Sequence, residues 1–313
     1  MLKRLFTSAF ILSFCLLLLL FSVVLPNIPI MPVGMGAFAA CATFELLRCT
    51  HLAQRGLVAF PAYILSFILP IGAFFAKDMM DYIAIAFCAL FAYMLYLFIV
   101  AIFSHNSHKS VIPADVTDAE GQKSTLSERG LFFRDVALAV TGLMYIAMSF
   151  TGLVLLRRYS IDGMSHHYGL YLFATVFFIA WMTDVFAFFT GTWFGKHKLI
   201  PEVSPKKSVE GAIGGIVGGV VGCVAYALFI QYTTAYTPNL IMFIIMGAIG
   251  SVVSQAGDLI ASLIKREYGV KDYGQLLPGH GGILDRFDSI IAATTVVVAF
   301  SFLRGDLALI TLA

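Results

Sequence analysis

Long apolar runs separated by short polar segments dominate the pattern of the chain. A membrane-spanning helix needs about 20 predominantly apolar residues, and nine stretches approach that length. The pattern therefore predicts an all-α, polytopic integral membrane protein. The nine expected spans are residues 5–25, 30–47, 57–76, 80–103, 132–156, 168–193, 209–231, 239–264 and 287–310.

The composition leads to the same class. Of the 313 residues, 60% are hydrophobic and 12% are charged, and the mean hydropathy is +0.91. A soluble domain of this length is not expected to be so apolar. The formal net charge of +2 says little about partners, and apart from the lipid bilayer itself no macromolecular ligand such as nucleic acid is expected.

The basic residues predict an orientation for these spans. The start of the chain, Met-Leu-Lys-Arg and then an apolar run, is similar to a signal peptide, but the run is near full span length and lacks an Ala-x-Ala cleavage site. We interpret it as an uncleaved first helix with a cytoplasmic N-terminus. Sixteen of the 20 Lys and Arg residues then lie inside, and the four outside are Lys77, Arg157, Arg158 and Arg304.

Two regions follow from this topology. Residues 1–131 are expected to hold the N-terminal transmembrane helices and, from 104 to 131, a polar cytoplasmic loop rich in Ser, Asp, Glu and Lys. Residues 132–313 are expected to form a C-terminal transmembrane catalytic region.

The six glycines of helix 209–231 form two series, and within each series the glycines are four residues apart. We assign both series to close helix packing. They are Gly211, Gly215, Gly219 and Gly214, Gly218, Gly222.

The charges of this apolar chain gather in one segment, residues 255–289, which holds nine Asp, Glu, Lys and Arg residues. Charged side chains at a membrane are costly and by default indicate a functional site. At 100° per residue, five polar residues of the preceding helix and its extension fall within an arc of about 80°. They are Ser251, Gln255, Asp258, Ser262 and Lys265.

The carboxylates of this segment predict a metal site. Asp285 and Asp288 are three residues apart and share a face if a helix begins there. Carboxylates that converge with Asp258 repel one another unless a cation lies between them. Hard oxygen ligands suit Mg²⁺, which binds few carboxylates and bridges substrate phosphates. Asp258, Asp285 and Asp288 are therefore the predicted metal ligands.

Basic residues and glycines around these carboxylates predict a phosphate-rich ligand. Lys206 and Lys207 lie in a loop directly before a helix, where cations and helix amides together form an anion site, although ordinary positive-inside charge is the alternative. A Gly/His turn follows in the C-terminal loop. The catalytic candidates are Asp258, Lys265, Asp285 and Asp288, and the substrate-binding candidates are Ser204, Lys206, Lys207, Ser262, Arg266, Lys271, Asp272, His280, Gly281, Gly282 and Arg286.

The C-terminal segment is similar to the signature of the phosphatidate cytidylyltransferases, also called CDP-diacylglycerol synthases. The matching residues read Ser262-x-x-Lys265-Arg266-x4-Lys271-Asp272-x-Gly274-x-x-Leu277-Pro278-x-His280-Gly281-Gly282-Ile283-x-Asp285-Arg286-Phe287-Asp288. The resemblance extends upstream to Trp181-x-x-Asp184, Gly195-Lys196 and Ser204-Pro205-Lys206-Lys207-Ser208-x-Glu210-Gly211, with a weaker echo at 40–45. Phe188 and Ser208 depart from the family's usual Tyr and Thr.

The resemblance implies a reaction in which CTP and phosphatidate give CDP-diacylglycerol and pyrophosphate. It also implies Mg²⁺, help from a monovalent cation such as K⁺, a homodimer, and a cell (inner or plasma) membrane enzyme whose site faces the cytoplasm. In this interpretation Asp184 and Asp272 hold a supporting or cation-binding role. The alternative is an ion-coupled transporter that uses the intramembrane carboxylates Asp184 and Asp258, although the charges gather at one membrane face.

Overall fold

A computed structural model describes residues 27–107, 131–158, 168–274, 281–303 and 308–312, with isolated positions between 17 and 25. The expected first span and most of the expected loop at 104–131 lie outside these residues, and so does His280. The chain divides into two compact units, one of residues 1–148 and 273–284, and one of residues 149–272 and 285–313. The boundary passes through two helices, whereas the functional boundary expected at 131 stays a prediction.

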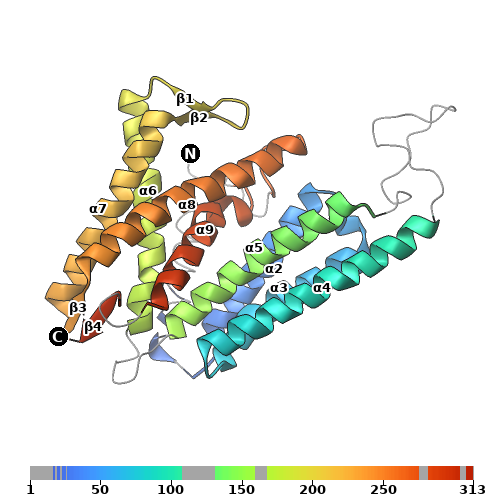
Figure 1. The fold of residues 1–313 in the computed structure, drawn as a ribbon, viewed down its shortest axis with the longest axis horizontal. Coiled ribbons are helices and arrows are strands. Elements are labelled where there is room, and N and C mark those ends of the chain that lie inside the picture. The colour runs from blue at the N-terminus through green and yellow to red at the C-terminus, as the bar shows by residue number, and fades with distance from the viewer. Residues whose placement is uncertain are drawn as a thin grey trace. The chain divides into compact units, whose positions relative to one another are not determined.

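The first unit is built from helices that pack through small and apolar side chains. Figure 1 shows α2 and α3 beside α4, and the start of α5 belongs to the same unit. Leu97 and Leu143 are fully buried in its core, and the Tyr93 hydroxyl donates to the carbonyl of Val58 at 2.9 Å. The elements are α2 (Ile30–Cys49), the short 3-10 helix η1 (Leu52–Gln54), α3 (Gly56–Phe75), α4 (Met79–Ser107) and α5 (Phe133–Arg158).

The second unit contains the long helices α6, α7 and α8, together with the end of α5 and nearly all of α9. Both glycine series of α7 lie at helix contacts, as the sequence predicts. A Cβ atom at Gly218 would meet the Phe186 side chain of α6, and one at Gly219 would meet Ser251 of α8. Close backbone approach therefore holds the three helices together. They are α6 (Tyr168–Phe194), α7 (Val209–Thr233), α8 (Leu240–Glu267) and α9 (Leu284–Ser301).

Short strands at opposite ends of α7 add to the helical fold (Figure 1). The predicted basic loop before α7 is an antiparallel hairpin of β1 (Lys198–Ile200) and β2 (Ser204–Ser208). After α7, β3 (Tyr236–Pro238) pairs antiparallel with β4 (Ile310–Leu312). The prediction of a helix over 287–310 is therefore wrong at both ends, since α9 covers Leu284–Ser301 and residue 310 begins a strand. Hydropathy alone does not distinguish an apolar strand from the last turns of a helix.

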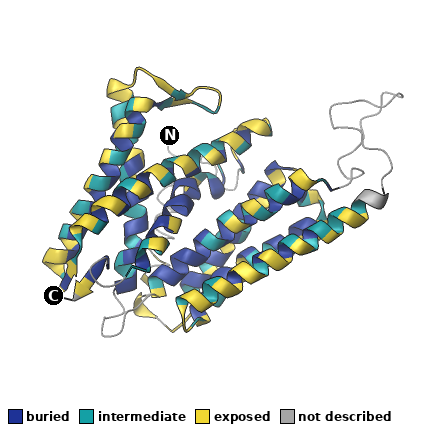
Figure 2. Cartoon of the chain, in the orientation of Figure 1, coloured by how far each residue is buried: buried dark blue, intermediate teal, exposed yellow. Residues whose placement is uncertain are grey.

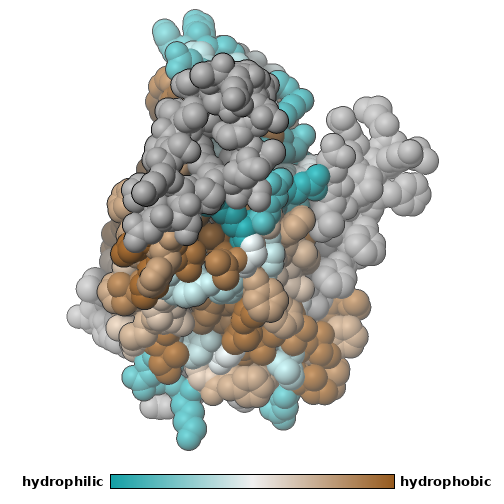
Figure 3. All heavy atoms as spheres, turned by 90° about the vertical axis from the view of Figure 1, so that its right-hand side faces the viewer, coloured by the Kyte–Doolittle hydropathy of each residue, from teal (hydrophilic) through white to brown (hydrophobic). Residues whose placement is uncertain are grey.

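The all-α membrane class is confirmed, because seven helices of the described residues are long and apolar enough to cross a membrane. They are α2 to α8, while α9 falls short because charged residues fill its first turns. Figure 2 shows exposed stripes along α7 and α8, and on α7 the exposed side chains of Ile213, Val217 and Val221 recur every four residues. Figure 3 shows that hydrophobic residues cover much of one described face. Such surface suits lipid contact, while the count of nine spans and the side of the N-terminus stay predictions.

Candidate functional site

Four of the five polar stripe residues of α8 contact other elements of the second unit. At the N-terminal end of the stripe, Ser251 is fully buried and accepts a hydrogen bond from Thr183 of α6 at 2.8 Å. One turn further, the Gln255 amide donates to the carbonyl of Ala212 on α7 at 3.2 Å. The neutral polar residues thus join helices, and the charged residues lie toward the C-terminal end of α8.

Lys207 reaches the stripe from the hairpin. It lies on β2, directly before Ser208, whose hydroxyl caps α7 by accepting from the amide of Gly211 at 3.1 Å. The Lys207 ammonium is 2.7 Å from a carboxylate oxygen of Asp258, and both side chains are a little over a quarter exposed. The ammonium nitrogen itself is buried, and its nearest charged partner is the Asp258 carboxylate. An ammonium has three donors, so Lys207 can contact a further anion beside Asp258.

A second ion pair lies about two helical turns further along α8. The Lys265 ammonium is 2.8 Å from Asp285 in the first turn of α9, and their side chains are 10% and 6% exposed. This pair is far less accessible to solvent than the pair of Lys207 and Asp258. The sequence predicts both as catalytic residues and Asp285 also as a metal ligand, and the structure pairs them with each other.

Three carboxylates of the second unit lie within electrostatic range of one another. The Asp258 carboxylate repels the charged carboxylates of Asp184 and Asp288, and Asp184 and Asp288 also repel each other. Asp288 is 9% exposed, and one of its oxygens accepts from the amide of Ser289 at 2.8 Å. The Ser289 hydroxyl donates to the same Asp288 oxygen at 3.4 Å, and Ser289 also lies within electrostatic range of Asp184. Asp184, which sequence reasoning gave a supporting role, therefore belongs to the same acidic cluster as two predicted metal ligands.

The carboxylate oxygens of this cluster suit a divalent cation whose remaining ligands are water and substrate phosphate. No three His, Cys, Asp or Glu side chains of the described residues are grouped tightly enough to hold a metal alone. Mg²⁺ does not require such a cage, because it keeps waters and uses one or two carboxylates together with substrate phosphates. Mutual repulsion among Asp184, Asp258 and Asp288 is what a bound cation would relieve. The metal assignments stay predictions.

The other predicted binding residues differ in their surroundings. Arg266 donates to the carbonyls of Val203 at 3.3 Å and Val270 at 3.2 Å, so it ties α8 to the hairpin. Ser262 donates to Asp258 at 3.4 Å. The exposed residues of the set are Lys206, Lys271, Asp272 and Arg286, and Ser204 is half-buried.

Gly281 and Gly282 belong to the first unit, where they precede α9. Gly281 has φ +84°, a backbone conformation that glycine adopts without penalty. Beside this segment lies Glu45 of α2, which is 4% exposed and which sequence reasoning left out of the site. The signal was available, because an acid in an apolar span is costly unless it has partners.

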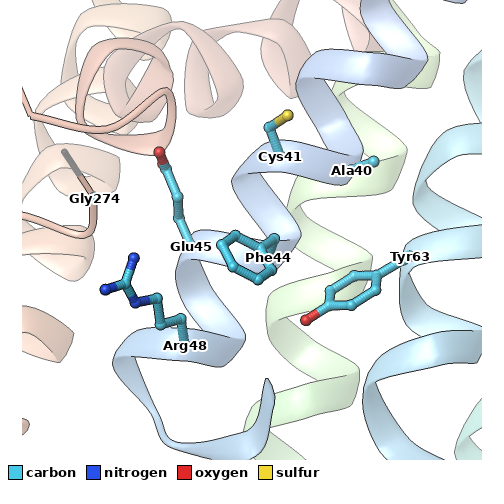
Figure 4. A pocket seen from close by; sticks show the side chains of 7 residues that line it. All are labelled: Ala40, Cys41, Phe44, Glu45, Arg48, Tyr63 and Gly274. Carbon is cyan, nitrogen blue, oxygen red and sulfur yellow. The ribbon is translucent and has the colours of Figure 1, made fainter. Parts of the chain in front are cut away.

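Glu45 also lines a cavity of about 550 Å³ in the first unit. Figure 4 shows the Glu45 side chain directed toward the segment of Gly274, with Arg48 beside it and the Phe44 and Tyr63 rings further along. The wall is mostly apolar, and its lining residues are Ala40, Cys41, Phe44, Glu45, Arg48, Tyr63 and Gly274.

The apolar helices and the paired lysines and aspartates define a membrane protein with a site suited to a phosphate-bearing ligand. The chain matches the model of the Cytidylyltransferase family over residues 3–303. It belongs to this family, and the resemblance seen in its motifs is confirmed.

Curated relatives share part of their length with this chain. The phosphatidate cytidylyltransferase of Staphylococcus haemolyticus (strain JCSC1435) is 38% identical over 168 residues, which are 54% of this chain and 60% of the relative. The phosphatidate cytidylyltransferase of Haemophilus influenzae is 45% identical over 147 residues, 46% of this chain and 51% of the relative. The matched region thus covers less than two thirds of these relatives. The transporter interpretation of Asp184 and Asp258 finds no support in these matches.

Proposed function

We propose that the protein is a phosphatidate cytidylyltransferase, which converts CTP and phosphatidate into CDP-diacylglycerol and pyrophosphate. Family membership over residues 3–303 and the activity named for the curated relatives support the reaction class. The observation that carries the proposal is the charged end of α8. There Asp258 and Lys265 each pair with an opposite charge, from the hairpin and from α9. Such alternating charges suit a polyphosphate with its cation.

Cation binding is assigned to the acidic cluster. Asp258 and Asp288 would hold Mg²⁺ with support from Asp184, and Asp285 is the remaining predicted ligand. A monovalent cation such as K⁺ is the proposed second ion near these carboxylates. When bound, the divalent ion would neutralise part of the negative charge of the triphosphate.

The reaction needs little covalent chemistry from the protein. The phosphatidate phosphate is ionised at neutral pH, so one of its oxygens attacks the α-phosphorus of CTP without a strong general base. The new P–O bond forms as the bond from the α-phosphorus to the bridging oxygen breaks, and pyrophosphate leaves with that electron pair. The protein's role is to hold two anions together, through positioning and charge. Lys207 and Lys265 lie nearest the acidic cluster for this purpose.

The remaining substrate-binding assignments follow the signature. Arg266, Lys271 and Arg286 are the proposed cations, and Ser204, Ser262 and Asp272 are the proposed polar contacts. His280, Gly281 and Gly282 stay predicted binding residues. The proposed protein is a homodimer in the cell membrane, with its site open to the cytoplasm.

Pyrophosphate release tests the proposal directly. Purified protein in detergent micelles should release pyrophosphate only when CTP, phosphatidate and Mg²⁺ are all present, and EDTA should stop the release. Asp285→Ala should abolish turnover in a protein that still inserts and elutes as a single species. Asp81→Ala is the matched control, because Asp81 is an exposed acid in the first turn of α4. Near-normal turnover by Asp285→Ala would refute the role of Asp285, and no turnover by the unmodified protein would refute the reaction.

A further inference from the structure

We propose that Glu45 of α2 is a positioning residue for the catalytic carboxylates, because it fixes the backbone from which α9 begins. The inference rests on the proposed function for its catalytic consequence, while the contact itself stands on geometry alone. Glu45 is far from the signature in sequence, and its partners, Ile283 and Leu284, belong to the same compact unit.

Both oxygens of the Glu45 carboxylate are used by this backbone. The amide of Ile283 donates to Oε1 at 3.0 Å and the amide of Leu284 donates to Oε2 at 2.9 Å. All three residues are buried, with exposures of 4%, 5% and 3% for Glu45, Ile283 and Leu284. A two-oxygen contact restricts rotation of the segment more than a single hydrogen bond would, and hydrogen bonds to a carboxylate are among the strong ones in proteins.

The start of α9 needs such a partner. The first amides of a helix have no acceptor within the helix, and they are usually satisfied by a Ser, Thr, Asp or Asn side chain just before it. Here the preceding residue is Ile283, whose side chain has no acceptor atom. Glu45 therefore provides the cap from another helix, and its negative charge is favourable at a helix N-terminus.

Two glycines of the same segment are fitted around this carboxylate. A Cβ atom added at Gly274 or at Gly282 would collide first with the Glu45 side chain, and the three nearest atoms at each position all belong to Glu45. Neither glycine has a positive φ, so the side chain of Glu45 and not backbone strain explains the absence of a Cβ. Gly274 and Gly282 thus both lie against the Glu45 side chain.

The consequence for function follows along the chain. Asp285 and Asp288 lie in the first turns of α9, directly after the amides that Glu45 holds. A shift of about 1 Å in a catalytic group can lower turnover by about 100-fold. Loss of the cap should therefore reduce kcat and raise the Mg²⁺ concentration needed for half-maximal rate, with little change in the KM for phosphatidate.

The test compares Glu45→Gln and Glu45→Ala with Asp135→Asn. Asp135 is a matched control, because it is a 5% exposed acid of the same unit and its carboxylate accepts from the amide of Phe132 at 3.1 Å. We expect kcat to fall about tenfold in Glu45→Gln, which keeps one acceptor, and about 100-fold in Glu45→Ala. Asp135→Asn should lower thermal stability yet keep kcat and the Mg²⁺ dependence of the folded protein. Parallel losses of stability and kcat in the Glu45 and Asp135 variants would reduce Glu45 to a structural residue and overturn the proposal.

A double-mutant cycle and hydrogen exchange test the contact without reference to turnover. Gly274→Ala should lower the thermal midpoint in the unmodified protein, and it should do so much less in the Glu45→Ala background, where the obstructing side chain is absent. Peptides containing Ile283 and Leu284 should exchange amide hydrogens faster in Glu45→Ala than in Asp135→Asn. Additive effects in the cycle, or unchanged exchange, would overturn the cap. An unmodified protein with no turnover would instead refute the proposed function and leave these two measurements to decide the contact.

Discussion

Lys206 and Lys207 are neighbours in sequence with different environments. Both lie on β2, and successive side chains of a strand point to opposite faces. Only Lys207 is directed to Asp258, at 2.7 Å, while Lys206 is exposed. The sequence motif gives both residues the same role, and the strand separates them.

Substitution of these two lysines should therefore have unequal effects. Lys207→Ala removes a buried ammonium beside the acidic cluster, and loss of one preorganised electrostatic contact typically lowers kcat by about 100-fold or more. Lys206→Ala should lower it by about tenfold or less, since a solvated cation is screened. Steady-state pyrophosphate release over a range of CTP concentrations measures both. Equal losses would show that the hairpin presents both lysines to the substrate.

The two ion pairs of α8 should also differ in their contribution to stability. Removing one partner of a buried pair costs about 3–5 kcal/mol, because the other charge remains buried, whereas an exposed pair contributes about 0–1 kcal/mol. Asp285→Asn should therefore lower the thermal midpoint in detergent more than Asp258→Asn, whose pair with Lys207 is partly exposed. The reverse order would indicate that Asp285 is compensated by other neighbours.

At the level of elements, α7 organises the second unit. Its glycines face α6 and α8, its first turn is capped by Ser208 of the hairpin, and its exposed side carries branched apolar residues. Glu210 in that first turn also holds the backbone before β1, since its carboxylate accepts from the amide of Lys196 at 3.1 Å and contacts the His197 ring at 2.6 Å. The helix thus fixes the hairpin that carries Lys207.

Added volume on α7 should matter only on its packed side. Gly219→Ala would place a methyl group against Ser251 and Thr183, and overpacking of this kind costs about 1–3 kcal/mol. Val217→Leu adds volume on the exposed side, where Val217 is 54% exposed, and should leave stability nearly unchanged. Thermal unfolding of both variants in the same detergent compares them. A tolerated Gly219→Ala would show that α6 and α8 can move away from α7.

For the whole molecule, the distribution of basic residues predicts which side of the membrane each loop occupies. The hairpin with Lys198 is expected in the cytoplasm and the turn with Lys77 outside. Both residues are exposed, so each position is accessible to a chemical label.

Cysteine labelling should verify this topology. In a cysteine-free background, an impermeant maleimide should label Lys77→Cys in intact cells and Lys198→Cys only after permeabilisation. Labelling of both positions in intact cells would contradict the odd number of spans between them, and the reverse pattern would invert the orientation.

The amino-acid sequence by itself determined the membrane class, seven of the spans, the charged stripe of α8 and the family signature. These are local properties, because apolar length and helical spacing depend on residues close in the chain. It also gave the correct function for the α7 glycines, since small residues four apart have one common use in helices.

Only the tertiary structure decided which charges are partners. Lys265 pairs with Asp285, Asp184 joins Asp258 and Asp288, and Glu45 caps a helix that begins more than 200 residues later in the chain. It also ended α9 at Ser301 and made residues 310–312 a strand. Contacts between distant segments depend on how helices pack, and the spacing of residues along the chain carries no record of that packing.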